Sequence, residues 1–211
     1  MLSNHKIKKI IKILNCIYPD VPHFLHHKNV FEFLIAVILS AQTTDNKVNQ
    51  VTPKLFARFP DHKSLAKADL SEVMDIIKEI NYYKTKSKHI IETAKIIEAD
   101  FGGKVPNNIE DLLKLKGVGR KVANVILCDY FNKPVGIVVD THVKRVSYRL
   151  GFTNEKNPEK IEKDLMNKIP KKYWTKISKQ LILIGRNFCH PRKPNCDKCP
   201  LSEICTKNLI N

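Results

Sequence analysis

The 211-residue chain has little glycine, no long hydrophobic run and too few acidic side chains to balance its basic ones. Only 7 glycines stand among abundant Lys, Ile, Leu and Glu, and this composition favours helices. The longest apolar run, residues 33–39, is too short to cross a bilayer. The N-terminal residues lead into an amphipathic helix and contain no apolar signal-peptide core. We therefore expect no membrane association and a cytoplasmic protein, nucleoid-associated if the source is prokaryotic. We also expect a monomer.

The charge of the chain is strongly one-sided. Its 37 Lys and Arg residues face 21 Asp and Glu residues, which gives a net charge of +16. Such a surplus points to a polyanionic partner, most simply nucleic acid. The alternative is a basic protein whose lysines are only solvated.

Hydrophobic periodicity predicts an all-α chain without repeats. Pro53 implies a kink or break in its helix, Ser71 is the expected cap of another, and Thr85 or Ser87 should start the helix after a loop at 81–84. Residues 135–139 have strand composition but no partner strand, so we expect a buried extended connection. The expected helices cover residues 3–18, 31–41, 46–59, 63–68, 71–80, about 85–101, both sides of 115–121, 141–150, 158–169 and 173–188.

A short hairpin lies at the middle of the chain. Residues 115–121 read Leu-Lys-Gly-Val-Gly-Arg-Lys between two apolar-periodic segments, which predicts a helix, a tight Gly-x-Gly turn and a second helix. Glycine permits positive φ and close approach of another backbone, and free amides at the start of the second helix favour a phosphate. Taken alone, the motif fits a plain turn between packed helices equally well.

Four of the six cysteines lie near the C-terminus, with the spacing Cys189-x6-Cys196-x2-Cys199-x5-Cys205. In a reducing compartment this clustering indicates a metal site more than disulfides. Four-cysteine zinc sites usually separate two Cys-x2-Cys pairs by a longer loop. A single compact loop suits an iron–sulfur cluster better, although zinc stays an alternative.

The loop between the first two of these cysteines is basic and stiff. Pro191 and Pro194 flank Arg192 and Lys193, which are suitable phosphate contacts. The alternative is a disordered basic loop.

Three features occur together in this order: the hairpin with Lys121, the segment Val-Asp-Thr-His-Val at 139–143, and the 6-2-5 cysteine spacing. The combination resembles the endonuclease III family, the iron–sulfur helix–hairpin–helix DNA glycosylases that are also abasic-site (AP) lyases. The resemblance extends from residues 31–42 to Cys205. It implies base excision repair of oxidised pyrimidines in double-stranded DNA, cleavage 3′ to abasic sites, and a [4Fe-4S] cluster on the four cysteines, Cys189, Cys196, Cys199 and Cys205.

The resemblance also implies the domain organisation. A six-helix barrel would cover residues 22–134, with the helix–hairpin–helix at about 108–128. Residues 1–21 and 135–211 would form a discontinuous iron–sulfur domain, with the cluster loop at 189–205. A DNA-binding cleft would lie between the two helical domains.

Two residues carry the chemistry that the resemblance implies. Lys121 would be the amine nucleophile that captures C1′ as a Schiff base, after which β-elimination cuts the strand. Asp140 would stabilise positive charge on the sugar and manage protons. Their plain alternatives are a solvated lysine and a helix cap.

DNA contacts follow from the same resemblance. Gln42 would fill the space left by the extruded nucleotide, and Tyr82 would be a second wedge where many relatives have an aliphatic residue. The alternative for Tyr82 is packing on the barrel. The other expected DNA contacts are Leu115, Gly117, Val118, Gly119, Arg120, Arg192 and Lys193.

The sequence differs from many endonuclease III relatives at two positions. At other positions it differs from related families of glycosylases. Lys116 replaces a common proline, and Ile184 replaces a common histidine. Adenine-mismatch glycosylases of the superfamily lack a lysine at position 121 and place a glutamate within residues 36–38; thymine-mismatch glycosylases also lack the lysine. A non-catalytic DNA-binding hairpin module is the competing hypothesis from another class, and Lys121 with Asp140 discriminates against it.

Overall fold

A computed structural model describes residues 2–207, and every regular element in them is a helix. The all-α prediction is therefore confirmed for this part of the chain. The residues divide into two compact units, one of 23–133 and one that joins the residues up to Pro22 with those from Pro134 onward. None of the helices in the described part is long and apolar enough to cross a membrane.

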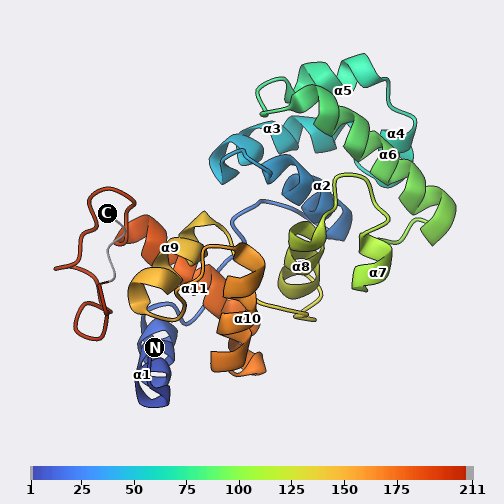
Figure 1. Cartoon of the computed structure of the whole chain (residues 1–211). Coiled ribbons are helices and arrows are strands. Elements are labelled where there is room, and N and C mark those ends of the chain that lie inside the picture. The colour runs from blue at the N-terminus through green and yellow to red at the C-terminus, as the bar shows by residue number, and fades with distance from the viewer. Residues whose placement is uncertain (1, 208–211) are drawn as a thin grey trace. The chain divides into compact units, whose positions relative to one another are not determined.

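The 23–133 unit is built around helix α2, which lies among the other helices of the unit (Figure 1). All nine residues of 31–39 in α2 are buried, and α2 packs against α3, α6 and α8. Asn29 caps α2 by accepting from the backbone N–H of Glu32 at 2.9 Å. The helices of this unit are α2 (Val30–Ser40), α3 (Asp45–Arg58), α4 (His62–Ala66), α5 (Leu70–Ile77), α6 (Tyr83–Phe101), α7 (Ile109–Leu112) and α8 (Arg120–Asp129).

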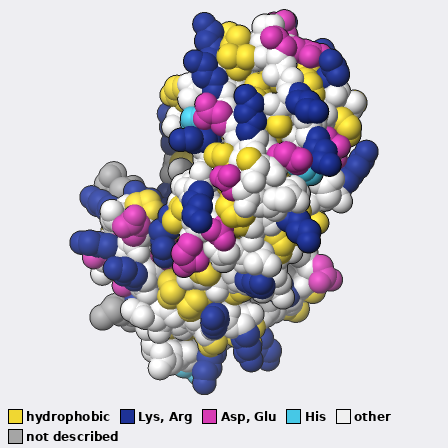
Figure 2. Space-filling model, turned by 90° about the vertical axis from the view of Figure 1, so that its right-hand side faces the viewer, with side chains coloured by type: hydrophobic (Ala, Val, Ile, Leu, Met, Phe, Trp, Pro, Cys, Tyr) yellow, Lys and Arg dark blue, Asp and Glu magenta, His cyan; other side chains and the backbone are white. Residues whose placement is uncertain are grey.

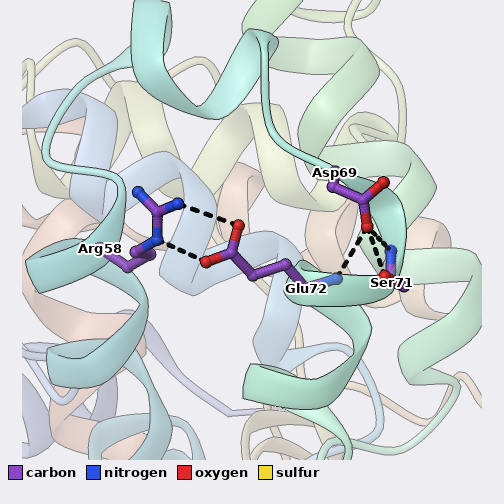
Figure 3. A network of polar contacts seen from close by, with 4 residues as sticks. All are labelled: Arg58, Asp69, Ser71 and Glu72. Carbon is purple, nitrogen blue, oxygen red and sulfur yellow. Dashed lines mark hydrogen bonds and ion pairs between the residues drawn. The ribbon is translucent and has the colours of Figure 1, made fainter.

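Three local predictions in this unit need correction. Helix α3 continues through Pro53, so of the predicted kink or break, the break does not occur. The cap of α5 is Asp69 and not Ser71: one Asp69 oxygen accepts from the backbone N–H groups of Ser71 and Glu72, at 2.8 and 3.2 Å (Figure 3). Glu72 also pairs with Arg58 of α3, which anchors this end of α5.

Helix α6 begins at Tyr83, before the predicted start at Thr85 or Ser87. Its N-cap, Tyr82, has left-handed backbone angles and makes no side-chain capping bond. The last helical residue is Phe101, and the C-cap Gly102 is also left-handed, as the Gly-Gly pair at 102–103 favours.

The second unit joins the first helix to the C-terminal helices. Buried Gln180 on α11 donates to the carbonyl oxygens of Leu14 and Tyr18, each at 3.1 Å, and so holds the C-terminal end of α1. The extended segment 135–139 is only partly buried: Ile137 is in the core, but Val135 is 38% exposed. The elements of this unit are α1 (Asn4–Ile17), α9 (Thr141–Leu150), α10 (Pro158–Lys168), η1 (Lys171–Tyr173) and α11 (Trp174–Asn187).

Basic side chains are spread over the surface. Figure 2 shows Lys and Arg on much of the face it presents, with Asp and Glu between them. This distribution accords with the net charge of +16.

Candidate functional site

The hairpin turn between α7 and α8 packs closely on its own unit. Gly117 has φ +77°, and a Cβ there would lie 3.1 Å from both His89 Nδ1 and Ile38 Cγ2. Thr93 Oγ1 on α6 donates to the Lys116 carbonyl at 2.8 Å. Only glycine fits at position 117 without strain, because the backbone is left-handed and the neighbours are close.

Gly119 has a different role in the hairpin. It is the N-cap of α8 with extended angles, φ −89° and ψ 176°, and a Cβ there would meet nothing within 4 Å. No side chain caps α8, whereas Asp140 and Asn157 cap α9 and α10. The first backbone N–H groups of α8 therefore lack the usual side-chain acceptor, which suits an external anion.

The other hairpin residues predicted to contact DNA fall into two groups, one with buried and one with exposed side chains. The side chains of Leu115 and Val118 are buried, at 3% and 6% exposed, so only their backbone can face a ligand. The side chains of Arg120 and Lys121 are exposed. Lys121 is the second residue of α8, and its ammonium has no ion-pair partner among residues 2–207.

Asp140 is the N-cap of α9 and is half-buried. One carboxylate oxygen accepts from the backbone N–H of Val143 at 2.7 Å, which leaves the second oxygen outside this bond. Asp140 therefore does cap α9, as the alternative interpretation stated. A cap uses only one acceptor and needs no negative charge, so capping leaves a catalytic role open.

His142, which the sequence pattern did not single out, lies two residues after this cap. Burial lowers its pKa, and the positive charges of Arg145 and Arg186 lower it further, while the charge of Asp140 opposes the shift. The Arg145 guanidinium lies 3.1 Å from His142 Nδ1 and donates to the carbonyl oxygens of Gly185 and Cys189 at 3.1 and 2.8 Å. Arg145 therefore links α9 to the end of α11 and to the first cysteine.

The four C-terminal cysteines line one pocket, Cys189, Cys196, Cys199 and Cys205. Apolar side chains, including Leu150 and Ile184, form its walls. Burial raises the pKa of the Cys199 and Cys205 thiols, and the neighbouring cysteines raise it further. Thiolates in such a place need a compensating positive charge, which a metal centre supplies.

The donor set fits a multi-atom cluster. Four cysteines around a common apolar pocket match the ligation of an iron–sulfur cluster, whose irons each take one thiolate.

Buried Arg149, also missed from the sequence, fastens both ends of the cysteine loop. Its guanidinium donates to the carbonyl oxygens of His190 and Pro191 at 2.7 and 2.8 Å and lies 3.3 Å from Cys189 Sγ. Its own carbonyl accepts from Thr206 Oγ1 at 2.9 Å. A sequence pattern could not reveal this, because a lone arginine in an amphipathic helix is ordinarily a surface residue.

The exposed loop that Arg149 supports carries the predicted phosphate contacts. Arg192 and Lys193 are both exposed, between Pro191 and Pro194. The carbonyl oxygens of the preceding residues are held by Arg149, so the basic side chains project from an anchored loop.

Gln42 and Tyr82 lie in two exposed turns of the 23–133 unit. Both are non-glycine residues with positive φ, 55° and 59°. The Asn81 side-chain amide donates to the Gln42 carbonyl, which ties the two turns together. Tyr82 is 65% exposed, so it does not pack on the barrel core.

Comparisons with known proteins cover nearly the whole chain. A family model described as "HhH-GPD superfamily base excision DNA repair protein" matches residues 35–171, and one described as "Iron-sulfur binding domain of endonuclease III" matches residues 189–205. The chain is 43% identical to an endonuclease III of Synechocystis sp. over 96% of this chain and 93% of that one. It is 41% identical to an endonuclease III of Bacillus subtilis, over 97% and 94%. Among solved structures, a trapped endonuclease III–DNA covalent intermediate matches with a TM-score of 0.91 and 38% identity, over 98% of this chain and 97% of that one.

Proposed function

The chain belongs to the endonuclease III family of base-excision DNA repair proteins, and from that premise we propose its catalytic residues and its DNA substrate. It is a bifunctional DNA glycosylase and AP lyase that binds DNA and carries a [4Fe-4S] cluster. The observation that carries the assignment of residues is Lys121, an exposed, unpaired amine in the first turn of the uncapped helix α8.

In the proposed reaction, Lys121 Nζ bonds to C1′ of the damaged nucleoside as the bond from C1′ to the base breaks. The base leaves as an anion and takes up a proton from water. The proton that the amine gives to Asp140 passes to O4′ as the ring opens at C1′–O4′, which gives a protonated Schiff base. The Schiff base acidifies the 2′ position; loss of a 2′ proton and of the 3′ phosphate then cuts the strand. The phosphate beside the lesion would accept from the first backbone N–H groups of α8, which no side chain caps, and this brings the sugar to the lysine.

Asp140 is the proposed partner of this step. Its carboxylate, fixed by the bond to the Val143 N–H, would stabilise the positive charge that develops on the sugar and take the proton that the attacking amine loses. The cap fixes the carboxylate without using its second oxygen.

We propose duplex DNA with oxidised pyrimidines or abasic sites as the substrate and a monomer as the acting form. Gln42 and Tyr82 would enter the helix as the nucleotide leaves it, and both are exposed on left-handed turns. Gly117, Gly119 and Arg120, with the backbone at Leu115 and Val118, would grip one strand; Arg192 and Lys193 would contact phosphate from the other unit.

Cys189, Cys196, Cys199 and Cys205 are the proposed cluster ligands, as their shared pocket supports. When bound, the cluster supplies the cross-link that holds their loop in place, and it takes no part in the chemistry proposed above. Arg149 shares that task by binding the loop carbonyls.

A lesion panel tests this proposal. Duplexes with thymine glycol, an abasic site, 8-oxoguanine or a normal pair would be incubated with wild type, Lys121→Gln and the surface control Lys163→Gln, and base release and strand scission measured separately. We expect release from thymine glycol and scission at the abasic site by wild type and the control, with both lost in Lys121→Gln. Full release by Lys121→Gln would refute the lysine assignment, and wild-type activity on 8-oxoguanine alone would refute the proposed substrate.

A further inference from the structure

Four non-glycine residues in the described part of the chain have positive φ: Gln42, Tyr82, Asn132 and Lys207. Two of the four are the proposed wedge residues. Bulky residues keep this conformation only where the surrounding contacts over-determine it. The contacts that hold these two turns should therefore matter for the reaction.

A buried lysine holds the Gln42 turn. Lys86 on α6 is only 6% exposed, and its Nζ donates to the carbonyl oxygens of Leu39 and Ala41 at 2.8 and 2.6 Å and to Thr43 Oγ1 at 3.2 Å. These three acceptors lie on both sides of Gln42 in the sequence. Two of them are at the C-terminal end of α2, where a cation is favoured.

The burial of this ammonium is itself informative. A lysine loses solvation when it is buried, and here burial lowers its pKa to about 8. A buried lysine is retained where its hydrogen bonds do something that an apolar side chain cannot do. At this place they fix the backbone on both sides of an exposed left-handed residue.

The same lysine is joined to the second wedge. The backbone N–H of Lys86 donates to the Tyr82 carbonyl at 3.0 Å as the first bond of α6, and Asn81 donates to the Gln42 carbonyl. The Gln42 and Tyr82 turns are therefore joined by hydrogen bonds, and Lys86 is bonded to both.

The face of α6 that carries Lys86 also supports the hairpin. Thr93, seven residues further along α6, donates to the Lys116 carbonyl, and His89 lies against Gly117. Residues 86, 89 and 93 share one face of a helix, and the first and last are about 10 Å apart along its axis. Helix α6 thereby fixes the spacing between the wedge turns and the hairpin turn.

We propose that Lys86 is a positioning residue for nucleotide extrusion: it holds the Gln42 turn in the shape that enters the DNA. This rests on the wedge role proposed above for Gln42. A turn that is already ordered loses no conformational entropy at insertion, so extrusion becomes easier while binding to duplex phosphate is unchanged.

The test is Lys86→Met, which keeps the aliphatic stem and removes the three donors. Lys95→Met, an exposed lysine on the same helix, is the control for lost charge. Single-turnover release of thymine glycol would be measured on two DNAs, one with the lesion paired and one with the lesion opposite a one-nucleotide gap, where no partner base needs to be replaced.

For Lys86→Met we expect release from the paired duplex to fall on the order of tenfold, which corresponds to about 1.4 kcal/mol. Release from the gapped DNA and the Kd for undamaged duplex should stay within about twofold of wild type. Equal loss on both DNAs, or no loss on the paired duplex, would overturn the inference. Lys95→Met should match wild type on both.

Thr93→Val gives the opposite pattern and guards against a purely structural explanation. Loss of the bond to Lys116 loosens the hairpin and not the wedge, so the Kd should rise for both DNAs alike. If Lys86→Met and Thr93→Val behave identically, general loosening of the unit explains both and the inference is wrong.

Gln42→Ala separates this inference from the function on which it rests. If Gln42→Ala releases the paired lesion at the wild-type rate, the wedge role itself fails, and the inference with it. If Gln42→Ala is impaired on the paired duplex and Lys86→Met is not, the wedge role stands and the positioning role of Lys86 is refuted.

Discussion

The two roles of Asp140, helix cap and catalytic carboxylate, can be separated by substitution. Asn is as good an N-cap as Asp, so Asp140→Asn keeps the acceptor for the Val143 N–H and removes only the charge. Asp140→Ala removes both. The two variants should therefore differ in stability but agree in activity.

The magnitudes follow from the geometry at the start of α9. Loss of the 2.7 Å capping bond should cost Asp140→Ala about 1 kcal/mol of unfolding free energy, in addition to the charge effect that both variants share. Asp140→Asn loses only the attraction of the charge to the helix dipole, about 0.3–1 kcal/mol. Loss of a positioned acid–base group should slow base release by about 10²–10⁴-fold in both variants.

The assay pairs urea unfolding with single-turnover release of thymine glycol. Asn157→Ala is the matched control, because Asn157 caps α10 through the N–H groups of Glu159 and Lys160 at 2.9 and 3.2 Å. It should lose about 1 kcal/mol of stability, as Asp140→Ala does, and keep its full rate of release. Wild-type release by Asp140→Asn, with loss confined to Asp140→Ala, would show that Asp140 is a cap and nothing more.

Three further predictions follow from the geometry. Arg149→Gln leaves the loop carbonyls of the cysteine pocket without their charged donor, so iron should be lost at a lower temperature; unchanged thermal loss of iron-dependent absorbance would contradict this. Gly117→Ala should lower the unfolding free energy by about 1–2 kcal/mol, whereas Gly119→Ala should leave it within about 0.5 kcal/mol and weaken DNA binding, as urea titration and Kd at fixed salt would measure. Burial lowers the pKa of Lys86 from 10.5 to about 8, so between these values the unfolded chain binds the extra proton and stability rises with pH. The unfolding free energy of wild type relative to Lys86→Met should climb across that window by at most about 1.4 kcal/mol per pH unit and be flat below pH 8; no rise would mean that the lysine is not desolvated.

Local patterns were sufficient to predict most helices and the cysteine pocket. Residues 33–39 are apolar at every position, and such a segment has no stable place except the core. The cysteine spacing places four thiols in one short loop, and a metal centre bound by all four explains this clustering best.

The failures come from contacts between distant residues. Asp69 and Ser71 are both good caps, and in the structure Asp69 accepts from the N–H of Glu72 while the Glu72 side chain pairs with Arg58 of another helix. The start of α6 at Tyr83 depends on the left-handed Tyr82, whose neighbour Asn81 is bonded to the Gln42 turn.

The buried cations were beyond sequence reasoning for the same reason. Lys86 bonds to acceptors 43 to 47 residues away, and Arg149 bonds to carbonyls 41 and 42 residues away. In a sequence, each resembles an ordinary charged residue of a solvated helix face. Only the fold shows that both support exposed loops that carry proposed DNA contacts.

The most direct test of the central claim is to reduce the covalent intermediate with borohydride on abasic-site DNA and to identify the modified residue by peptide mass spectrometry. The Schiff-base mechanism predicts an adduct on Lys121 in wild type and no adduct in Lys121→Gln. An adduct on any other lysine, or none in the wild-type protein, would contradict the account.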